Sequence, residues 1–73
     1  MIVYESDLKK QARHEMEDCV DYICAGDMKK AHQCYGRARA YEDMLLDEGI
    51  DLEEECEEYK QMKDFYQEKG DKQ

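Results

Sequence analysis

Apolar side chains recur along this chain at the three- and four-residue spacing of amphipathic helices. In the first third, the positions from Leu8 to Ile23 form one helical stripe. Ser6 can cap the start of a helix that carries this stripe, and Gly26 can end it. The pattern therefore predicts a first helix over residues 6–25.

A second stripe follows at once and predicts a second helix over residues 27–48. Asp27 is a suitable N-cap, and Gly49 fits the left-handed position of a Schellman motif after the helix. Gly36 lies inside this helix, where glycine costs about 1 kcal/mol relative to alanine. We therefore expect close packing at Gly36.

The last third repeats the same spacing and predicts a third helix over residues 51–69. Asp51, followed three residues later by Glu54, resembles a capping box at its start. With no intervening glycine or proline before residue 70, the pattern indicates one continuous helix.

These elements define the fold class. Short connections between helices of similar length make neighbouring helices antiparallel. We therefore expect an all-α single domain over residues 1–73, built as a small three-helix bundle or a stacked helical hairpin. Residues 1–5 and 70–73 are expected to fray.

Residues 19–38 resemble one helical hairpin of the tetratricopeptide repeat family. The resemblance rests on small residues, aromatic residues and a Gly-Asp turn at Cys19, Tyr22, Gly26, Asp27, Ala31, Tyr35 and Ala38. The sequence departs from the family pattern at Glu15, Asp18 and Asp43. The resemblance implies two antiparallel helices that approach closely at their small side chains. It implies no peptide-binding groove, because such a groove needs several stacked repeats.

The charged residues add a prediction about the surface of the protein. Charged residues make up 42% of the chain, and the net charge is −9. The segment 42–58 contains ten acidic residues and no basic one. Such a chain should be repelled by nucleic acid and by anionic lipid, so we expect no direct nucleic-acid or membrane partner. The expected partner is another protein with a basic surface.

We expect the acidic segment and the apolar side chains beside it to form the partner-binding surface. Two other interpretations of the segment stay open. In the first, it only keeps a small protein in solution; in the second, its carboxylates mimic the phosphates of a nucleic acid. The residues predicted to bind a partner are Tyr41, Glu42, Asp43, Leu46, Asp47, Glu48, Glu53, Glu54, Glu57 and Glu58.

The sequence contains few residues that could form a catalytic or metal-binding site. The four cysteines, Cys19, Cys24, Cys34 and Cys56, contain no CxxC pair, and the two histidines do not share a helix face with them. Cys19 and Cys34 are almost equally distant from the predicted turn at Gly26 and should lie at the same level, packed as thiols or, under oxidation, joined by a disulfide. We predict no enzyme activity, no metal site and no cofactor.

The sequence thus favours a small, acidic, non-enzymatic interaction module that regulates or inhibits another protein. In its small size, acidity and helical character it resembles accessory proteins of phages and mobile elements. With no signal-peptide pattern or membrane span, a cytoplasmic location is expected. The alternatives are a self-assembling structural subunit and a nucleic-acid mimic. Because aliphatic residues are few, we also predict a homodimer, with Leu46, Tyr41 and the aromatic residues of the third helix at its interface.

Overall fold

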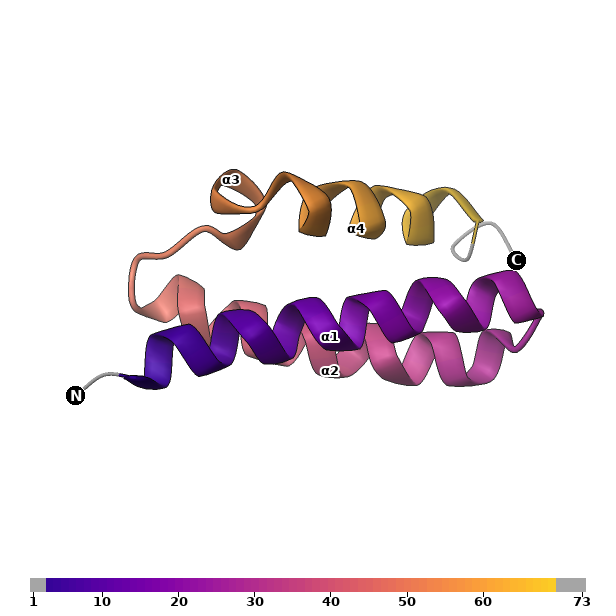
Figure 1. Ribbon diagram of the computed structural model, residues 1–73, viewed down its shortest axis with the longest axis horizontal. Helices are drawn as coiled ribbons and strands as arrows, with labels where there is room; N and C mark the ends of the chain where they lie inside the picture. The colour runs from indigo at the N-terminus through magenta and orange to yellow at the C-terminus, as the bar shows by residue number, and fades with distance from the viewer. Residues whose placement is uncertain (1–2, 70–73) are drawn as a thin grey trace.

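The computed structural model describes residues 3–69, and over this range it contains helices and no strand. A long hairpin is formed by α1 (Val3–Ala25) and α2 (Met28–Asp47). The short helix α3 (Leu52–Glu55) and the helix α4 (Glu57–Lys69) lie along this hairpin, and α4 runs in the same direction as α1 (Figure 1). Within the described range, no helix combines the length and apolarity needed to cross a bilayer.

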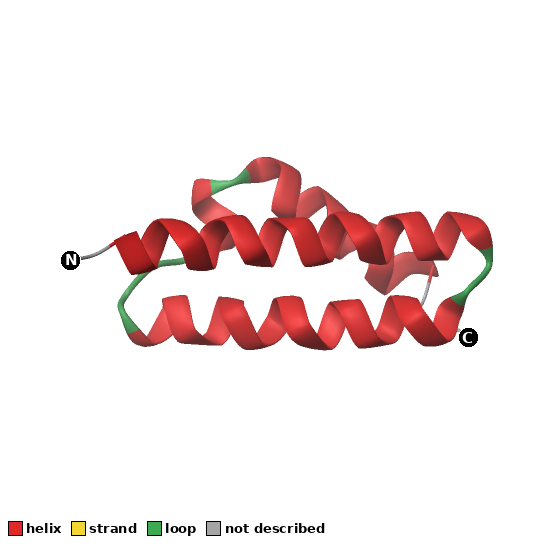
Figure 2. Ribbon diagram, turned by 60° about the horizontal axis from the view of Figure 1, so that its bottom comes forward, coloured by secondary structure: helices red, strands yellow, loops and turns green. Residues whose placement is uncertain are grey.

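Both long helices end at a glycine, as predicted. Gly26 and Gly49 have φ values of 84° and 82°, in the left-handed region. The amide of Asp27 donates to the carbonyl of Tyr22, and that of Ile50 donates to the carbonyl of Leu45 at 2.9 Å. These are Schellman motifs, and they give the short loops drawn in Figure 2.

The start of α1 differs from the prediction. Ser6 is not an N-cap but lies inside the helix, which begins at Val3. Residues 3–5, expected to fray, are helical because the stretch contains no Gly or Pro and because Glu5 pairs with Lys9 at 3.1 Å, one turn away. The expected fraying of residues 1–2 and 70–73 lies outside the described residues.

The prediction of one continuous third helix was wrong. The chain leaves the helix at Cys56, which has φ −131° and ψ 102°, so α3 and α4 are separate helices. A continuous helix would place Glu53 over Glu57 and Glu54 over Glu58, and like charges four residues apart destabilise a helix. Asp51 does cap α3, by accepting from the amide of Glu53, whereas the Glu54 side chain makes no reciprocal bond within residues 3–69.

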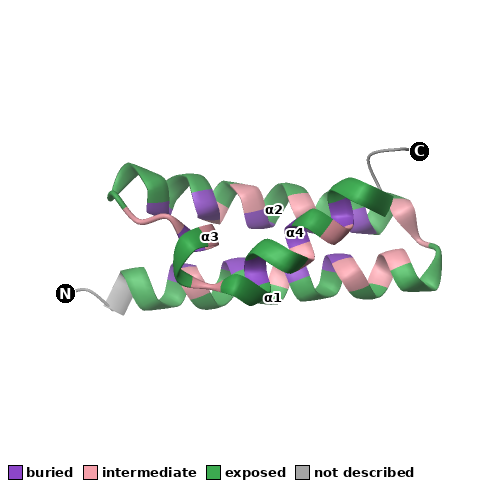
Figure 3. Ribbon diagram, turned by 90° about the horizontal axis from the view of Figure 1, so that it is seen from above, coloured by how far each residue is buried: buried purple, intermediate pink, exposed green. Residues whose placement is uncertain are grey.

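The core lies between the hairpin and α4 (Figure 3). Small side chains on facing sides of α1 and α2, including Ala12, Ala31 and Ala38, are fully buried and let the two helices pack closely. From α4, Tyr59 and Tyr66 fill much of the remaining volume. Aromatic bulk thus replaces the scarce aliphatic residues.

Candidate protein-interaction surface

Glu42 must be removed from the predicted surface. Its side chain is only 4% exposed, and its carboxylate accepts hydrogen bonds from the ammonium of Lys63 at 3.0 Å and from the hydroxyl of Tyr59 at 2.9 Å. Arg39 adds a guanidinium nitrogen at 3.6 Å. Glu42 therefore joins α2 to α4 and is inaccessible to a partner.

Lys63 connects three helices. Besides Glu42 on α2, its ammonium binds Glu53 on α3. Burial alone would lower the pKa of Lys63, but its hydrogen bonds to the two carboxylates outweigh burial and raise the pKa. The hydrogen bond from Lys63 lowers the pKa of Glu53. Both groups therefore stay charged at neutral pH, and Glu53 contributes mainly to the fold.

Other acidic residues of the segment 42–58 also meet cations that come from outside it. On α1, Lys9 lies 2.6 Å from Glu55, and Arg13 lies 3.9 Å from Glu58. On α2, Arg39 lies 3.5 Å from Asp43. These pairs lie at the surface, where water and salt screen them, so each contributes little to stability.

Four predicted residues remain exposed and have no ion pair or side-chain hydrogen bond within residues 3–69. Two of them end α2 or follow it, one lies in α3 and one begins α4. We call this set the acidic surface: Asp47, Glu48, Glu54 and Glu57.

The apolar residues predicted beside this surface do not form one patch. Leu46 is 46% exposed and directly precedes the acidic surface in the chain. Tyr41 is half-buried against the core, and its position on α2 is about 140° from that of Leu46. Met44 is exposed too, but it points nearly opposite to Leu46. Of these residues, Leu46 is the best candidate for an apolar contact at the acidic surface.

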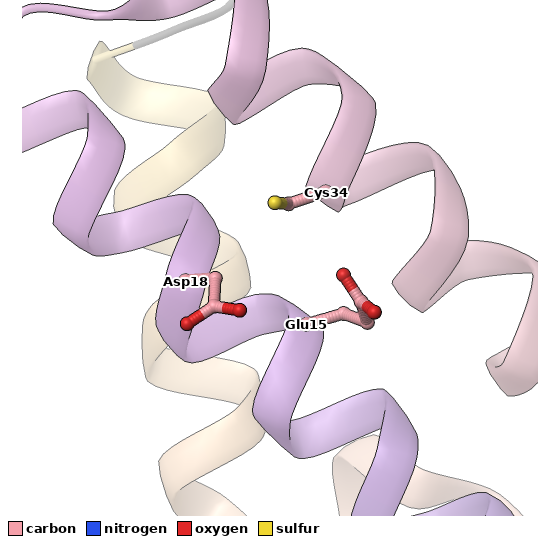
Figure 4. Close-up of side chains that lie close together, drawn as sticks. All are labelled: Glu15, Asp18 and Cys34. Atoms are coloured by element: carbon pink, nitrogen blue, oxygen red, sulfur yellow. The ribbon is translucent and has the colours of Figure 1, made fainter.

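One cluster escaped the sequence analysis. Glu15 and Asp18 of α1 face Cys34 of α2, with ligand atoms all within 4.8 Å of one another (Figure 4). Arg37 already occupies this cluster: its guanidinium lies 3.0 Å from Glu15 and 3.5 Å from the Cys34 sulfur. Burial raises the pKa of Cys34, which favours the neutral thiol. The arrangement is therefore satisfied by an arginine and needs no metal ion.

A second missed cluster holds the end of α4 against α2. The rings of Tyr35 and Tyr66 are stacked with centroids 3.8 Å apart. The hydroxyl of Tyr66 hydrogen-bonds Nδ1 of His32, and the His32 ring meets the Tyr66 ring edge-on. The spacing of Tyr35 and Tyr66 on their stripes placed both near the core, but no sequence signal pairs them.

Comparisons with protein-family models, curated proteins and solved structures found no match to this chain. The acidic residues of the segment 42–58 separate into two sets, those that hold the helices together and those that are left to the solvent.

Proposed function

We propose that the protein is a non-enzymatic interaction module that regulates or inhibits another protein by binding a basic patch on it. The proposed contact is the acidic surface, with Leu46 as its apolar element. The same chemistry fits a nucleic-acid-binding protein as the target, in which case the acidic surface acts as a mimic of phosphates.

The observation that supports this proposal is that the four residues of the acidic surface are exposed and form no ion pair within residues 3–69. Within residues 3–69, Lys9, Arg13, Arg39 and Lys63 all bind other acidic residues. The acidic surface is left with four carboxylates that no cation pairs within residues 3–69, in a chain whose net charge is −9. Like charges on one small molecule repel one another, and a basic partner would relieve the repulsion.

This proposal predicts how binding should depend on salt. Exposed charges steer association and mainly change its rate, whereas an apolar anchor mainly changes dissociation. The contribution of the acidic surface should therefore be large at low ionic strength. It should shrink as the Debye length falls from about 10 Å at 0.1 M salt to about 3 Å at 1 M.

The test compares wild type with a variant in which Asp47→Asn, Glu48→Gln, Glu54→Gln and Glu57→Gln are combined. A matched control neutralises four exposed acidic residues elsewhere, so the net charge changes equally: Asp7→Asn, Asp18→Asn, Asp21→Asn and Glu68→Gln. Each protein is immobilised and exposed to an extract of its source cells at low and high salt. Retained proteins are identified by mass spectrometry, and their association rates are measured after purification.

The proposal expects a basic protein that wild type and the control retain at low salt and that the four-amide variant loses. Competition by DNA for that protein would indicate the mimic. Equal association rates for the variant and the control at low salt would overturn the proposal, because the acidic surface would then act only through net charge.

A second candidate function is self-assembly as a structural subunit. The observation that favours it is an apolar groove between α1 and α4, whose walls include the partly exposed side chains of Val20, Met62 and Phe65. Covering this groove would extend a core poor in aliphatic residues. Sedimentation equilibrium across the micromolar range measures the mass, and a mass of one chain throughout would exclude this candidate.

A further inference from the structure

Two cysteines are buried on facing helices of the α1–α2 hairpin. Cys19 is fully buried, Cys34 is only 3% exposed, and both belong to the core as free thiols. Gly26, in the turn of the hairpin, lies seven residues after Cys19 and eight residues before Cys34. Because both helices rise by the same amount per residue, nearly equal distances from the turn place the two cysteines at the same level.

The side chains around Cys34 locate it beside Cys19. Its sulfur lies within 4.8 Å of a carboxylate oxygen of both Glu15 and Asp18 (Figure 4). Asp18 directly precedes Cys19, and Glu15 lies one turn before Cys19 on the same side of α1. Burial raises the pKa of Cys19, and the proximity of Cys34 raises this pKa further. The two thiols are therefore neighbours across the hairpin.

The two helices pack closely enough for a covalent link between them. Ala12, Ala31 and Ala38 are fully buried between α1 and α2, and small side chains at a contact allow helix axes to approach to about 8 Å. Since Cα atoms lie about 2.3 Å from a helix axis, facing Cα atoms then come closer than the roughly 7 Å beyond which a disulfide cannot form.

We propose that Cys19 and Cys34 form a reversible disulfide, which locks the α1–α2 hairpin when the protein meets a disulfide oxidant such as oxidised glutathione. The disulfide needs neither a partner protein nor self-assembly, so it goes beyond the functions proposed above. It would make the hairpin responsive to the redox state of its surroundings.

The reaction is a thiol–disulfide exchange in two steps. Cys34 reacts first, because it retains some exposure and its sulfur accepts a hydrogen bond from Arg37 at 3.5 Å. The Cys34 thiolate attacks one sulfur of the oxidant and expels one glutathione thiolate. The Cys19 thiolate then attacks the Cys34 sulfur of this mixed disulfide and expels the second glutathione thiolate. The two cysteines lose two electrons and two protons, and the oxidant becomes two molecules of glutathione.

The test uses the variant Cys24→Ser, Cys56→Ser, which removes the two cysteines that are not buried. It is equilibrated with mixtures of reduced and oxidised glutathione, once in buffer and once in concentrated urea. Intact mass detects the disulfide as the loss of two hydrogen atoms and distinguishes it from a glutathione adduct. Trypsin cuts after Lys29 and Lys30, between the two remaining cysteines, so the disulfide joins two separate peptides.

The folded chain should favour the disulfide over the unfolded chain by at least about tenfold, because the hairpin already holds the two sulfurs together. By thermodynamic linkage the same factor stabilises the folded state, so oxidation should also raise the urea midpoint. An equilibrium constant in buffer no higher than that in urea overturns the proposal. A glutathione adduct on Cys34 that Cys19 never displaces overturns it too.

The matched control is Cys19→Ala, Cys56→Ser, which leaves Cys24 and Cys34 as the available pair. Cys24 is only two residues from Gly26, so it lies about 9 Å from the level of Cys34 along the hairpin. This pair should show no preference for the disulfide in buffer over urea, and circular dichroism checks that the control is folded. An equal preference in both variants would overturn the assignment to Cys19.

Discussion

Lys63 of α4 and Glu42 of α2 form a buried ion pair, with Nζ 3.0 Å from Oε2 and side chains 8% and 4% exposed. Buried pairs of this kind are not strong stabilisers in themselves, because removing two charges from water offsets much of their attraction. Such a pair can instead fix the register of the elements it joins. Since Lys63 also binds Glu53 on α3, one ammonium connects α4 to both α2 and α3.

Removing one partner of this pair should be far more harmful than removing both. Lys63→Met leaves the carboxylate of Glu42 buried without its main cation, and we expect a loss of about 3–5 kcal/mol. For a chain of this size such a loss is comparable to the total stability, so the variant should be largely unfolded. Adding Glu42→Met should recover most of the loss. Urea unfolding followed by circular dichroism measures both variants.

The control for this prediction is Lys60→Met. Lys60 also forms an ion pair, with Asp64 at 3.3 Å, but both side chains are more than half exposed. The expected change is below about 1 kcal/mol. If Lys63→Met proved as mild as this control, the buried network would have no role in stability.

Replacing glycine by alanine should have opposite effects on stability at Gly36 and at Gly49. We expected close packing at Gly36, but the structure contradicts this: a Cβ there would meet no atom within 4 Å. Gly36→Ala should therefore stabilise the protein by about 1 kcal/mol, a rise in Tm of about 4–8 °C. Gly49→Ala should instead destabilise it by about 1–2 kcal/mol, because φ at Gly49 is 82°. Thermal unfolding of the two variants tests the contrast.

Stability should fall on the alkaline side, beginning near pH 9. Burial raises the pKa of Cys19 from an ordinary 9.0 to about 12. A group whose pKa is raised in the folded state contributes its full stability below the unfolded pKa, and loses it as pH rises through the folded value. The loss should therefore extend from pH 9 toward pH 12, as the unfolded chain releases a proton that the folded chain retains.

Urea midpoints at pH 7, 8, 9 and 10 test this expectation. Cys19→Ala should lower stability at every pH by leaving a small cavity, but its curve should fall less steeply between pH 9 and 10. Cys24→Ala is the control, since Cys24 is exposed. Parallel curves for wild type and Cys19→Ala would rule out a contribution from this thiol.

Local features of the fold were predictable because they depend on neighbouring residues. The N-cap at Asp27 and the Schellman turn at Gly49 require only short-range hydrogen bonds, and both are confirmed. The break at Cys56 was missed because no glycine or proline marks it. It lies among crowded acidic side chains, and Lys63, seven positions later, binds Glu53 on the other side of the break.

The candidate site was predictable in part, for the same reason. Net charge located an acidic segment, but charge counting along the chain cannot show which cations approach it from other helices. The spacing of the helical stripes did indicate part of the buried ion pair. Glu42 follows Ala38 by four and precedes Leu45 by three, and Lys63 stands in the same relation to Tyr59 and Tyr66. Two charged residues of opposite sign at core positions on adjacent helices indicate a buried pair.

Neutralising the acidic surface should change the free energy of unfolding differently for its two pairs of residues. Asp47 and Glu48 lie at the C-terminal end of α2, where the helix dipole disfavours negative charge, while Glu54 and Glu57 lie in the first turns of α3 and α4, where it favours it. Asp47→Asn with Glu48→Gln should therefore stabilise the fold by about 0.5–1 kcal/mol at low salt. Glu54→Gln with Glu57→Gln should be nearly neutral, because relief of repulsion is offset by a lost dipole interaction. The stabilisation by Asp47→Asn with Glu48→Gln should vanish at 1 M salt, where the Debye length is about 3 Å. Thermal unfolding of the two double variants at low and high salt measures the difference. Equal gains for both would mean that repulsion alone acts on these four charges.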